Sequence, residues 1–342
     1  MKKRLGSYLI SAARFEMKII LNSSITSLLA PLKQKPFPRR FKLSILSIIA
    51  LLCYSCSSQT SPGRNKLIKV LIVDGFSNHD WKKTSAVVKG RLERSGIVSV
   101  DVSTYPINEE KIKQWRPQFK NYDVVIQNCN DINGGPQWPR QVQKDLEAFV
   151  AQGGGLYILH SANNAFAEWP EYNKMIGLGW RSKNFGPAIS IDSHGHSHHI
   201  PTGKGDDTGH GHRVNALLTR LGEHPIHRGL PRQWMAADLE IYRYARGPAK
   251  NLSVLSYARD QKTNKNFPVE WVVNYGKGRV YNSTFGHHWS NQKDPAGMRC
   301  VAFRTLMLRA VEWLAGREVK STVPAKFPTA QKIQLKAKGN TQ

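Results

Sequence analysis

The stretch Gly153–Asn164 (GGGLYILHSANN) constrains the fold more than any other part of this chain. It begins with three glycines, continues as a short apolar run from Leu156 to Leu159, and changes abruptly to polar residues at His160. The apolar run is too short for a membrane span or a free-standing helix, so it predicts a buried strand between two turns. Such a strand delivers His160 to the edge of a sheet. There the imidazole either takes part in chemistry or only satisfies a backbone group.

The residues just upstream predict an amphipathic helix. Residues 137–152 place four apolar side chains on one side of a helix, namely Val142, Leu146, Phe149 and Val150. Helix, glycines, strand and polar turn then form one α/β unit. Because ligands of such units bind outside the carboxyl ends of the strands, His160 and Ser161 lie where chemistry is expected.

The rest of the chain repeats this pattern of short apolar strands and amphipathic helices. We expect further strands at residues 67–73, 97–102, 123–127, 252–258, 268–273 and 279–284, and further helices at 83–94 and 298–314. The region from Ile189 to Arg213 is expected to be a long loop or a short hairpin, and Gly276–Gly278 a tight turn. Short connections between strands and helices predict an α/β fold with a doubly wound, mostly parallel sheet flanked by helices.

The first residues resemble a bacterial lipoprotein signal. A positive segment, Lys33–Lys42, precedes the apolar run Leu43–Leu52, and Cys56 follows the small residue Ser55 as the expected site of lipidation. We therefore expect an exported protein, periplasmic or on the cell surface, that a lipid anchor holds at the membrane. A plain cleaved signal peptide is the alternative. The chain then divides into a leader at 1–56, a flexible linker at 57–66, one α/β domain at 67–317 and a loose basic tail at 318–342.

The net charge of +26 is unevenly placed, because residues 1–66 hold twelve basic residues against the single acid Glu16. The basic residues of the middle of the chain are scattered, with no stripe interleaved with aromatic residues, so we expect no nucleic-acid partner. The predicted domain holds two cysteines, Cys129 and Cys300, without Cys-x-x-Cys spacing, which excludes a zinc ribbon. Size alone does not demand a partner, although a homo-oligomer is compatible with the sequence.

Three of the predicted strands end in polar, histidine-containing segments. The first strand leads into Asn78-His79-Asp80-Trp81, the central one into His160-Ser161, and the last one into Gly286-His287-His288. Because the carboxyl ends of parallel strands meet at one edge of a sheet, these imidazoles should face a common cleft. Imidazoles there supply acid/base or metal-binding capacity near neutral pH.

Several motifs together resemble the ThuA-like family of trehalose-utilisation proteins. They are, in chain order, Asn78-His79-Asp80-Trp81, the glycine-strand-His-Ser-Ala run at 153–162, Glu223-His224-Pro225-Ile226, Gly229-Leu230-Pro231, Asp238–Tyr242, Tyr275–Val280 and Gly286-His287. The resemblance runs from about residue 69 to residue 316. It implies a class I glutamine amidotransferase-like, or flavodoxin-like, three-layer sandwich and a role in carbohydrate metabolism. It also implies a catalytic site of His160, Glu240, His224 and His287.

The order Asp-Leu-Glu at 238–240 departs from the Asp-Glu-Leu of many members, so either Asp238 or Glu240 could face the cleft. Glutamine amidotransferase chemistry is disfavoured because it needs a cysteine at the elbow after the strand, where this chain has His160 and Ser161. Serine hydrolase chemistry is disfavoured too, because Gly-x-Ser-x-Gly is absent. We assign His160 as acid/base, Glu240 as its partner or second base, and His287 as a stabiliser of developing negative charge.

The candidate substrate-binding residues are His79, Asp80, Trp81, Ser161, Asn163, Trp169, Trp180, Asp238 and His288. The three tryptophans offer flat apolar surfaces that could stack on sugar rings, but they could equally pack as hydrophobic lids. No cofactor follows from the sequence, although a divalent metal ion is compatible with it.

Residues 194–212 contain six histidines, and these could chelate a metal ion or lie in a solvated loop. Within the segment His210 and His212 are the first candidates for metal ligands, because they lie closest to the expected cleft. Two functions therefore compete. One is an exported enzyme acting on a sugar or keto-sugar as a lyase, hydrolase or isomerase, and the other is a non-catalytic carbohydrate-binding lipoprotein.

Overall fold

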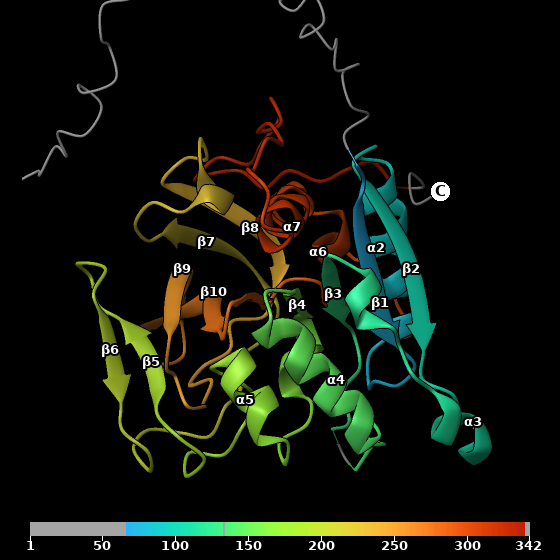
Figure 1. Ribbon diagram of the computed structural model, residues 1–342. Helices are drawn as coiled ribbons and strands as arrows, with labels where there is room; N and C mark the ends of the chain where they lie inside the picture. The colour runs from blue at the N-terminus through green and yellow to red at the C-terminus, as the bar shows by residue number, and fades with distance from the viewer. Residues whose placement is uncertain (1–65, 133, 339–342) are drawn as a thin grey trace, which may run out of the picture. The chain divides into compact units, whose positions relative to one another are not determined.

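The computed structural model describes residues 66–132 and 134–338 (Figure 1). The expected lipidation site Cys56 and the expected leader lie outside these described residues. The strands are β1 Ile68–Asp74, β2 Val98–Thr104, β3 Val124–Gln127, β4 Gly155–Leu159, β5 Ala188–Ile191, β6 Ser197–Ile200, β7 Val214–Arg220, β8 Gln233–Leu239, β9 Leu252–Asp260, β10 Lys265–Tyr275 and β11 Gly278–Ser283. The helices are α2 Trp81–Glu93, α3 Glu109–Gln114, α4 Arg140–Ala151, α5 Pro170–Ile176, α6 Ala296–Arg299 and α7 Val301–Leu314, with 3₁₀ turns η1 Phe119–Asn121, η2 His160–Asn164 and η3 Pro225–His227.

The fold is α/β, but the sheet is mixed, so the prediction of a doubly wound, mostly parallel sheet is wrong. The strand order is β2-β1-β3-β4-β11-β10-β9-β7-β8, and the hairpin β5–β6 pairs with β10 beside this path. The strands from β2 to β11 pair in parallel, whereas β11–β10, β10–β9, β9–β7 and β7–β8 are antiparallel. The reversal occurs at Gly276-Lys277, because a two-residue turn can join only antiparallel neighbours.

The elements of the parallel half lie where the sequence predicts them, within a few residues. The C-terminal helix is divided at Cys300, whose extended backbone (φ −56°, ψ 121°) separates α6 from α7. The region from Ile189 to Arg213 was expected to be either a long loop or a short hairpin, and the antiparallel pair β5–β6 begins there. Strands β7 and β8 were not expected.

Helices cover both faces of the sheet, with α6 and α7 on one side and α4 and α5 on the other (Figure 1). Alternate residues of β1 enter two separate cores: Val70 and Ile72 join the side chains of α2 and α7, whereas Leu71 and Val73 join those of α4 and α5. Both faces of β1 are thus buried, which explains why its sequence is almost continuously apolar.

Two glycines of the central stretch are required by their surroundings. A side chain at Gly155 would lie 2.6 Å from the carbonyl oxygen of Leu314, so glycine lets the end of α7 approach β4. Gly153 has φ +122°, a conformation that other residues rarely adopt. Gly153 therefore allows the turn before β4, and Gly155 allows the C-terminal end of α7 to pack directly against β4.

Residues 317–338 are mostly irregular, yet they contact the domain. The backbone N–H of Met235 donates to the Thr329 carbonyl (2.8 Å), the Val301 N–H donates to Gln334 (2.9 Å), and Leu335 forms a bridge with Cys300. Phe327 is buried against Trp234. The described part of the segment expected to be loose is therefore held against β8 and α7. Among the described residues, none of the helices has the length and apolar character needed to cross a bilayer.

Candidate active site

Segments that follow three strands of the parallel half bring three imidazoles together. His79 lies between β1 and α2, His160 directly follows β4, and His287 follows β11. The ring centroids are 5.0 Å apart for His79 and His160, 4.8 Å for His79 and His287, and 5.2 Å for His160 and His287. The structure therefore brings together three of the histidines that the strand ends predicted.

His160 has an unusual backbone and an incompletely satisfied side chain. Its φ of +46° is left-handed, a strained conformation for a residue other than glycine, and it turns the chain sharply from β4 into η2. Its Nδ1 lies 2.8 Å from the Thr284 carbonyl oxygen, so Nδ1 carries the proton and donates it there. The Nε2 atom is buried without a hydrogen-bond partner. Burial lowers the pKa of this imidazole to about 4, which keeps it neutral at pH 7.

Glu240, which follows β8, is the carboxylate of the site. It is 7% exposed, and its oxygens lie 3.6 Å from Nε2 of His160 and 3.4 Å from Nε2 of His287. A third imidazole, that of His210, has its Nε2 3.8 Å away. These separations are longer than ordinary hydrogen bonds, so the carboxylate lies among the imidazoles without tight pairing to any one of them.

His79 is oriented by two asparagines. Its Nδ1 lies 2.9 Å from Oδ1 of Asn78, and Nδ2 of Asn130 donates to the same oxygen at 2.8 Å. Because that oxygen is an acceptor, Nδ1 of His79 carries the proton and Nε2 holds the lone pair. Burial, followed by the nearby imidazole of His287, lowers the pKa of His79 to about 3.

His287 faces the guanidinium of Arg213. Nη1 of Arg213 lies 2.5 Å from Nδ1 and 3.1 Å from Nε2 of the imidazole, and its Nε pairs with Oδ1 of Asp238 at 3.0 Å. Burial first, then His160 and Arg213, lower the pKa of His287. Asp238 therefore orients Arg213, and Glu240 is the acid that faces the imidazoles, which settles which of the two residues points inward.

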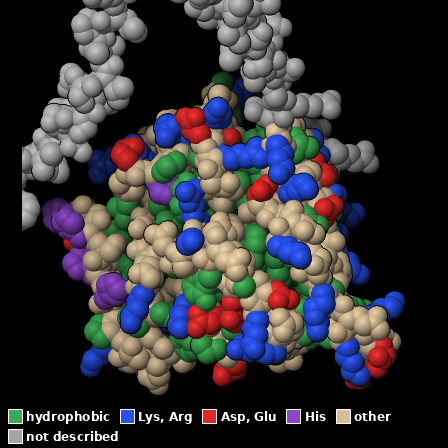
Figure 2. All heavy atoms as spheres, in the orientation of Figure 1, with side chains coloured by type: hydrophobic (Ala, Val, Ile, Leu, Met, Phe, Trp, Pro, Cys, Tyr) green, Lys and Arg blue, Asp and Glu red, His purple; other side chains and the backbone are tan. Residues whose placement is uncertain are grey.

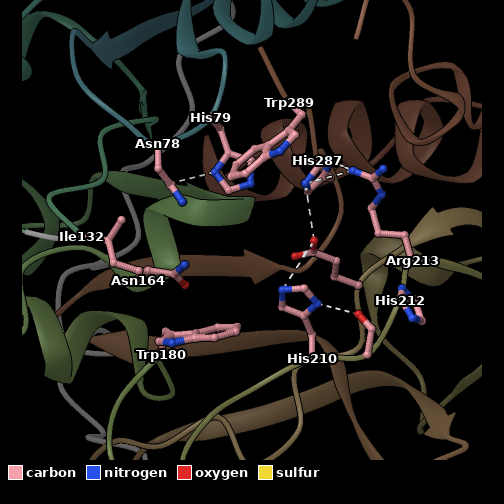
Figure 3. Close-up of a pocket in the computed structure, with 12 residues that line it drawn as sticks. Asn78, His79, Ile132, Asn164, Trp180, His210, His212, Arg213, His287 and Trp289 are labelled. Carbon is pink, nitrogen blue, oxygen red and sulfur yellow. Dashed lines mark hydrogen bonds and ion pairs between the residues drawn. The ribbon is translucent and has the colours of Figure 1, made fainter. Parts of the chain in front are cut away.

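A pocket of about 350 Å³ opens on this cluster (Figure 3). Glu240, His79, His287, His210, His212 and Trp180 line it, together with Asn78, Ile132, Asn164, Gly211, Arg213 and Trp289. Figure 3 shows Trp180 on one side of the pocket and Trp289 on the other. His160 does not line the pocket but lies directly behind His79 and His287, so substrate would meet Glu240 and His287 before it met His160.

A larger hollow of about 1,110 Å³ adjoins this pocket and shares His210, Gly211 and His212 with it. It runs along β7 and past Arg243 and Arg259. The pocket at Glu240 and this larger hollow together have room for a ligand that extends beyond the pocket.

Other residues expected at the site have structural contacts elsewhere. His224 packs its ring on Trp313 of α7 (4.9 Å), and its Nδ1 accepts from the N–H of Ile226, so it is not brought into the pocket. Trp169 is 2% exposed, donates from Nε1 to Glu147 (2.6 Å) and stacks on Tyr172, which makes it a core residue.

The segments beside His79, His160 and His287 hold further residues that do not line the pocket. Asp80 caps α2 by accepting from the N–H of Lys83 at 3.0 Å, which is typical of an N-cap. The neighbouring Trp81 lies in the first turn of that helix. Ser161 and Asn163 are buried, and Asn163 donates to the Leu178 carbonyl at 2.7 Å. His288 is buried and contacts the Gln292 carbonyl through Nε2 at 3.1 Å.

Sequence reasoning missed several pocket residues. Arg213 directly follows His210–His212, and Trp289 directly follows His287-His288. Both segments were predicted to lie near the cleft, so the next residue of each could have been included as a candidate. Asn78 and Asn164 stood inside recognised motifs without a role. Ile132 and Gly211 carry no chemical signal that would have identified them.

The histidine-rich segment splits into two parts. His194, His196, His198 and His199 lie exposed on or beside the hairpin β5–β6, where Figure 2 shows purple side chains gathered at one edge. His210 and His212 line the pocket instead. Within residues 66–132 and 134–338, one group of three His, Cys, Asp or Glu residues has ligand atoms within 4.8 Å of one another, and it is His79, His160 and His287.

The described residues hold no cysteine able to act as an amidotransferase nucleophile. Cys129 and Cys300 are both buried, and burial raises the pKa of each thiol. Ser161 follows His160, but its Oγ lies 3.4 Å from Oγ of Ser77 rather than against an imidazole. The chemical groups available at the pocket are therefore imidazoles, a carboxylate and a guanidinium.

Comparison with known proteins gives consistent matches. The family model ThuA, described as trehalose utilisation, matches residues 69–314. The crystal structure of a ThuA-like protein from Parabacteroides merdae has 32% sequence identity and a TM-score of 0.73, and the match covers 79% of this chain and 98% of that one. A ThuA-like protein from Bacteroides uniformis has 17% identity and a TM-score of 0.47, over 72% and 92% of the two chains. No curated protein sequence matches this chain.

Proposed function

This chain belongs to the ThuA family of trehalose utilisation, and from this premise we propose that it is an enzyme that acts on a sugar or keto-sugar by acid/base chemistry. The family match confirms the resemblance seen in the sequence motifs and relates the chain to carbohydrate use. The observation that carries the proposal is the carboxylate of Glu240, 7% exposed and lining the pocket beside the imidazoles of His160 and His287.

In this proposal Glu240 is the base that meets the substrate. Its carboxylate takes a proton from the carbon next to a keto group, and the electron pair of that C–H bond moves toward the keto oxygen. Return of the proton to the opposite face of the same carbon completes epimerisation. Its delivery to the former keto carbon, while the proton of the adjacent hydroxyl passes to the former keto oxygen, completes isomerisation, and departure of a leaving group from the next carbon completes elimination. Nε2 of His160 holds a lone pair 3.6 Å from the carboxylate, so His160, which does not itself reach the pocket, can accept a proton from Glu240 after the substrate has been deprotonated.

The developing negative charge on the substrate oxygen needs a positive or hydrogen-bonding group. Arg213 lines the pocket next to His287 and is held by Asp238, so it is ready before substrate binds. A cation beside the developing charge stabilises the transition state. Trp180 and Trp289 supply flat apolar surfaces for the sugar ring.

The test is turnover by Glu240→Gln and His160→Gln with a panel of disaccharides and their 3-keto forms, with products identified by mass. Loss of a positioned base costs about 10²–10⁴-fold in kcat, while ligand binding partly survives. Glu223→Gln is the matched control because Glu223 is 82% exposed in its side chain and lies outside the pocket. Full turnover in both site variants would refute the assignment. Sugar binding without turnover by the unaltered protein would favour the non-catalytic carbohydrate-binding protein.

We also propose that the protein is exported and anchored through a lipid on Cys56. The support is the order of positive segment, apolar run and cysteine in residues 33–56, which lie outside the described residues. Mass spectrometry of the protein from membrane fractions should find a lipidated N-terminal Cys56. Cys56→Ser should release the protein from the membrane, and an unmodified Cys56 in the membrane-bound protein would contradict the proposal.

A further inference from the structure

We infer that His79, His160 and His287 bind a divalent transition-metal ion such as Zn²⁺, with Glu240 beside it. The inference concerns the same site as the proposed function and relies on that function only for the ion's catalytic use. Imidazole nitrogen is a preferred ligand of zinc and of the neighbouring first-row metals. The ligand set differs from His210 and His212, which the sequence suggested.

The geometry of the three imidazoles is close to that of a zinc site. Their ligand atoms lie within 4.8 Å of one another. In a tetrahedral site with Zn–N bonds of about 2.0–2.1 Å, ligand nitrogens are about 3.4 Å apart, so closure of about 1.4 Å or less is needed. His79 is partly exposed and lies in the loop between β1 and α2, where rotation of the side chain can supply that closure.

Two of the imidazoles are already in the protonation state that a metal requires. Nδ1 of His160 donates to the Thr284 carbonyl, and Nδ1 of His79 donates to Oδ1 of Asn78. Each ring therefore directs a lone pair on Nε2 away from its anchor. Metal-binding histidines are typically held this way, with the second nitrogen donating to a carbonyl or a side-chain oxygen.

The Nε2 atom of His160 points independently to a missing partner. It is buried, it has no hydrogen-bond partner among the described residues, and the side chain is 3% exposed. Buried polar nitrogens are rarely left unpaired, and an ion among the three rings would satisfy this one. The 3.6 Å and 3.4 Å distances from Glu240 to His160 and His287 are too long for hydrogen bonds.

Glu240 gives the cluster a negative charge and a role beside the ion. Three imidazoles leave at least one coordination position open, which is the arrangement of catalytic rather than structural zinc sites. An ion there lowers the pKa of a bound water or polarises a substrate oxygen, and the Glu240 carboxylate receives the released proton.

Arg213 is the positive group that now faces His287. A metal ion would repel this guanidinium, which lies 3.1 Å from Nε2 of the imidazole through Nη1. Asp238 already pairs with Arg213 through Nε at 3.0 Å and gives it a position to which it can withdraw. The proposal therefore requires Arg213 to move toward Asp238 when the ion binds.

The test measures metal binding to the full chain without an affinity tag. The exposed histidines His194, His196, His198 and His199 are replaced by serine in every sample, because His196 and His198 pair with Asp192 at 3.2 Å and 2.9 Å and could chelate ions on their own. The protein is stripped with a chelator and loaded with Zn²⁺ or Co²⁺. Bound metal is counted by elemental analysis, affinity is measured by competition with a chelator, and Co²⁺ coordination is followed by visible absorption.

We expect one ion per chain. His79→Ala, His160→Ala and His287→Ala should each weaken binding more than about 100-fold, and Asn78→Ala by about 10- to 100-fold through loss of the anchor of His79. The matched controls are His210→Ala and His212→Ala, which remove pocket histidines outside the group of three. They should retain the affinity within about threefold.

Absence of tight binding by the reference protein would overturn the inference, as would loss of binding in the His210 or His212 variants with retention in the His79 variant. Thermal unfolding in the presence of chelator checks that each variant folds without metal. Because His79 is partly exposed, His79→Ala removes a ligand without disturbing the core. An ion bound without any sugar turnover would leave the metal site standing and refute the proposed enzyme. Turnover that persists in metal-free protein would leave the proposed enzyme standing and refute the catalytic use of the ion, while the binding measurements would still decide whether the metal site exists.

Discussion

The two-residue turn Gly276-Lys277 should be unable to accept a side chain at its first position, and Gly276→Ala tests this. Gly276 has φ +57°, and a Cβ there would lie 2.6 Å from the carbonyl oxygen and 2.8 Å from the Cα of Ala151, at the end of α4. Both atoms are backbone, so they cannot rotate away. The Lys277 N–H donates to the same carbonyl at 2.9 Å, which holds the turn against the helix.

Gly222 is the matched control, because it has the same φ of +57° and nothing within 4 Å of the position of a Cβ. Left-handed backbone costs a non-glycine residue about 1–2 kcal/mol, and this cost should be common to Gly222→Ala and Gly276→Ala. Overpacking against Ala151 adds about 1–3 kcal/mol for Gly276→Ala alone. We therefore expect a loss of about 1–2 kcal/mol at 222 and about 2–5 kcal/mol at 276.

Urea unfolding of the two variants beside the unaltered protein measures both free energies. In thermal unfolding each kcal/mol corresponds to a fall in Tm of about 2–4 °C for a domain approaching this size. Equal destabilisation of the two variants would refute the reasoning, because it would show that strain alone decides the cost. Since β11 leads to His287, the Gly276 variant should also lose ligand affinity, whereas the Gly222 variant should not.

Three further predictions concern pH, the buried core and the pocket. Burial lowers the pKa of His224 from 6.5 to about 4, so its contribution to stability is present above pH 6.5 and is lost as the pH falls toward 4. His79 and His160 lose stability over the same range, so His224→Gln should make this part of the stability profile less steep in chemical denaturation without abolishing it. Glu270, fully buried, accepts from Ser256 (2.6 Å) and Tyr281 (2.5 Å), so Glu270→Ala should cost about 3–5 kcal/mol in urea unfolding and Glu270→Gln less. Trp289→Ala should raise KM about 2- to 10-fold with little change in kcat, as expected for lost stacking of about 0.5–1.5 kcal/mol. The same pH response in the His224 variant and the unaltered protein would contradict the first prediction. An unchanged free energy of unfolding in Glu270→Ala would contradict the second, and a fall in kcat without a rise in KM for Trp289→Ala would contradict the third.

The sequence predicted the parallel half of the sheet because its strands are buried on both faces. β1 and β4 consist mostly of apolar residues between polar turns, and such runs are hard to mistake. β7 and β8 each carry polar residues at several positions, namely Asn215, Thr219 and Arg220 in β7 and Gln233 and Asp238 in β8, so their apolar runs are only three or four residues long. The tight turn at Gly276-Lys277 was recognised, but its consequence for strand direction was not drawn.

Histidine alone was a weak guide to the site. His224 and His287 both follow polar turns and both occur in motifs shared with the family, yet His287 lines the pocket and His224 caps η3 against Trp313. The two residues differ in the strand that precedes each of them: the parallel strand β11 ends just before His287, whereas His224 lies between the antiparallel strands β7 and β8. Spacing along the chain does not distinguish these positions, because both surroundings are polar.

The division of the sheet explains why some parts of the site could be predicted and others could not. The imidazoles of His79, His160 and His287 come from the parallel half, where strand ends share one edge by rule. Glu240 directly follows β8 and Arg213 directly precedes β7 in the antiparallel half, where neighbouring strands run in opposite directions and no such rule applies. Glu240 was accordingly expected only through the family resemblance, and Arg213 was missed. The antiparallel pairing of β7 with β8, in which Val214 lies opposite Leu239, thus brings a carboxylate and a cation to the same edge as the three neutral imidazoles. In a parallel pair Arg213, at the start of β7, would lie at the other edge.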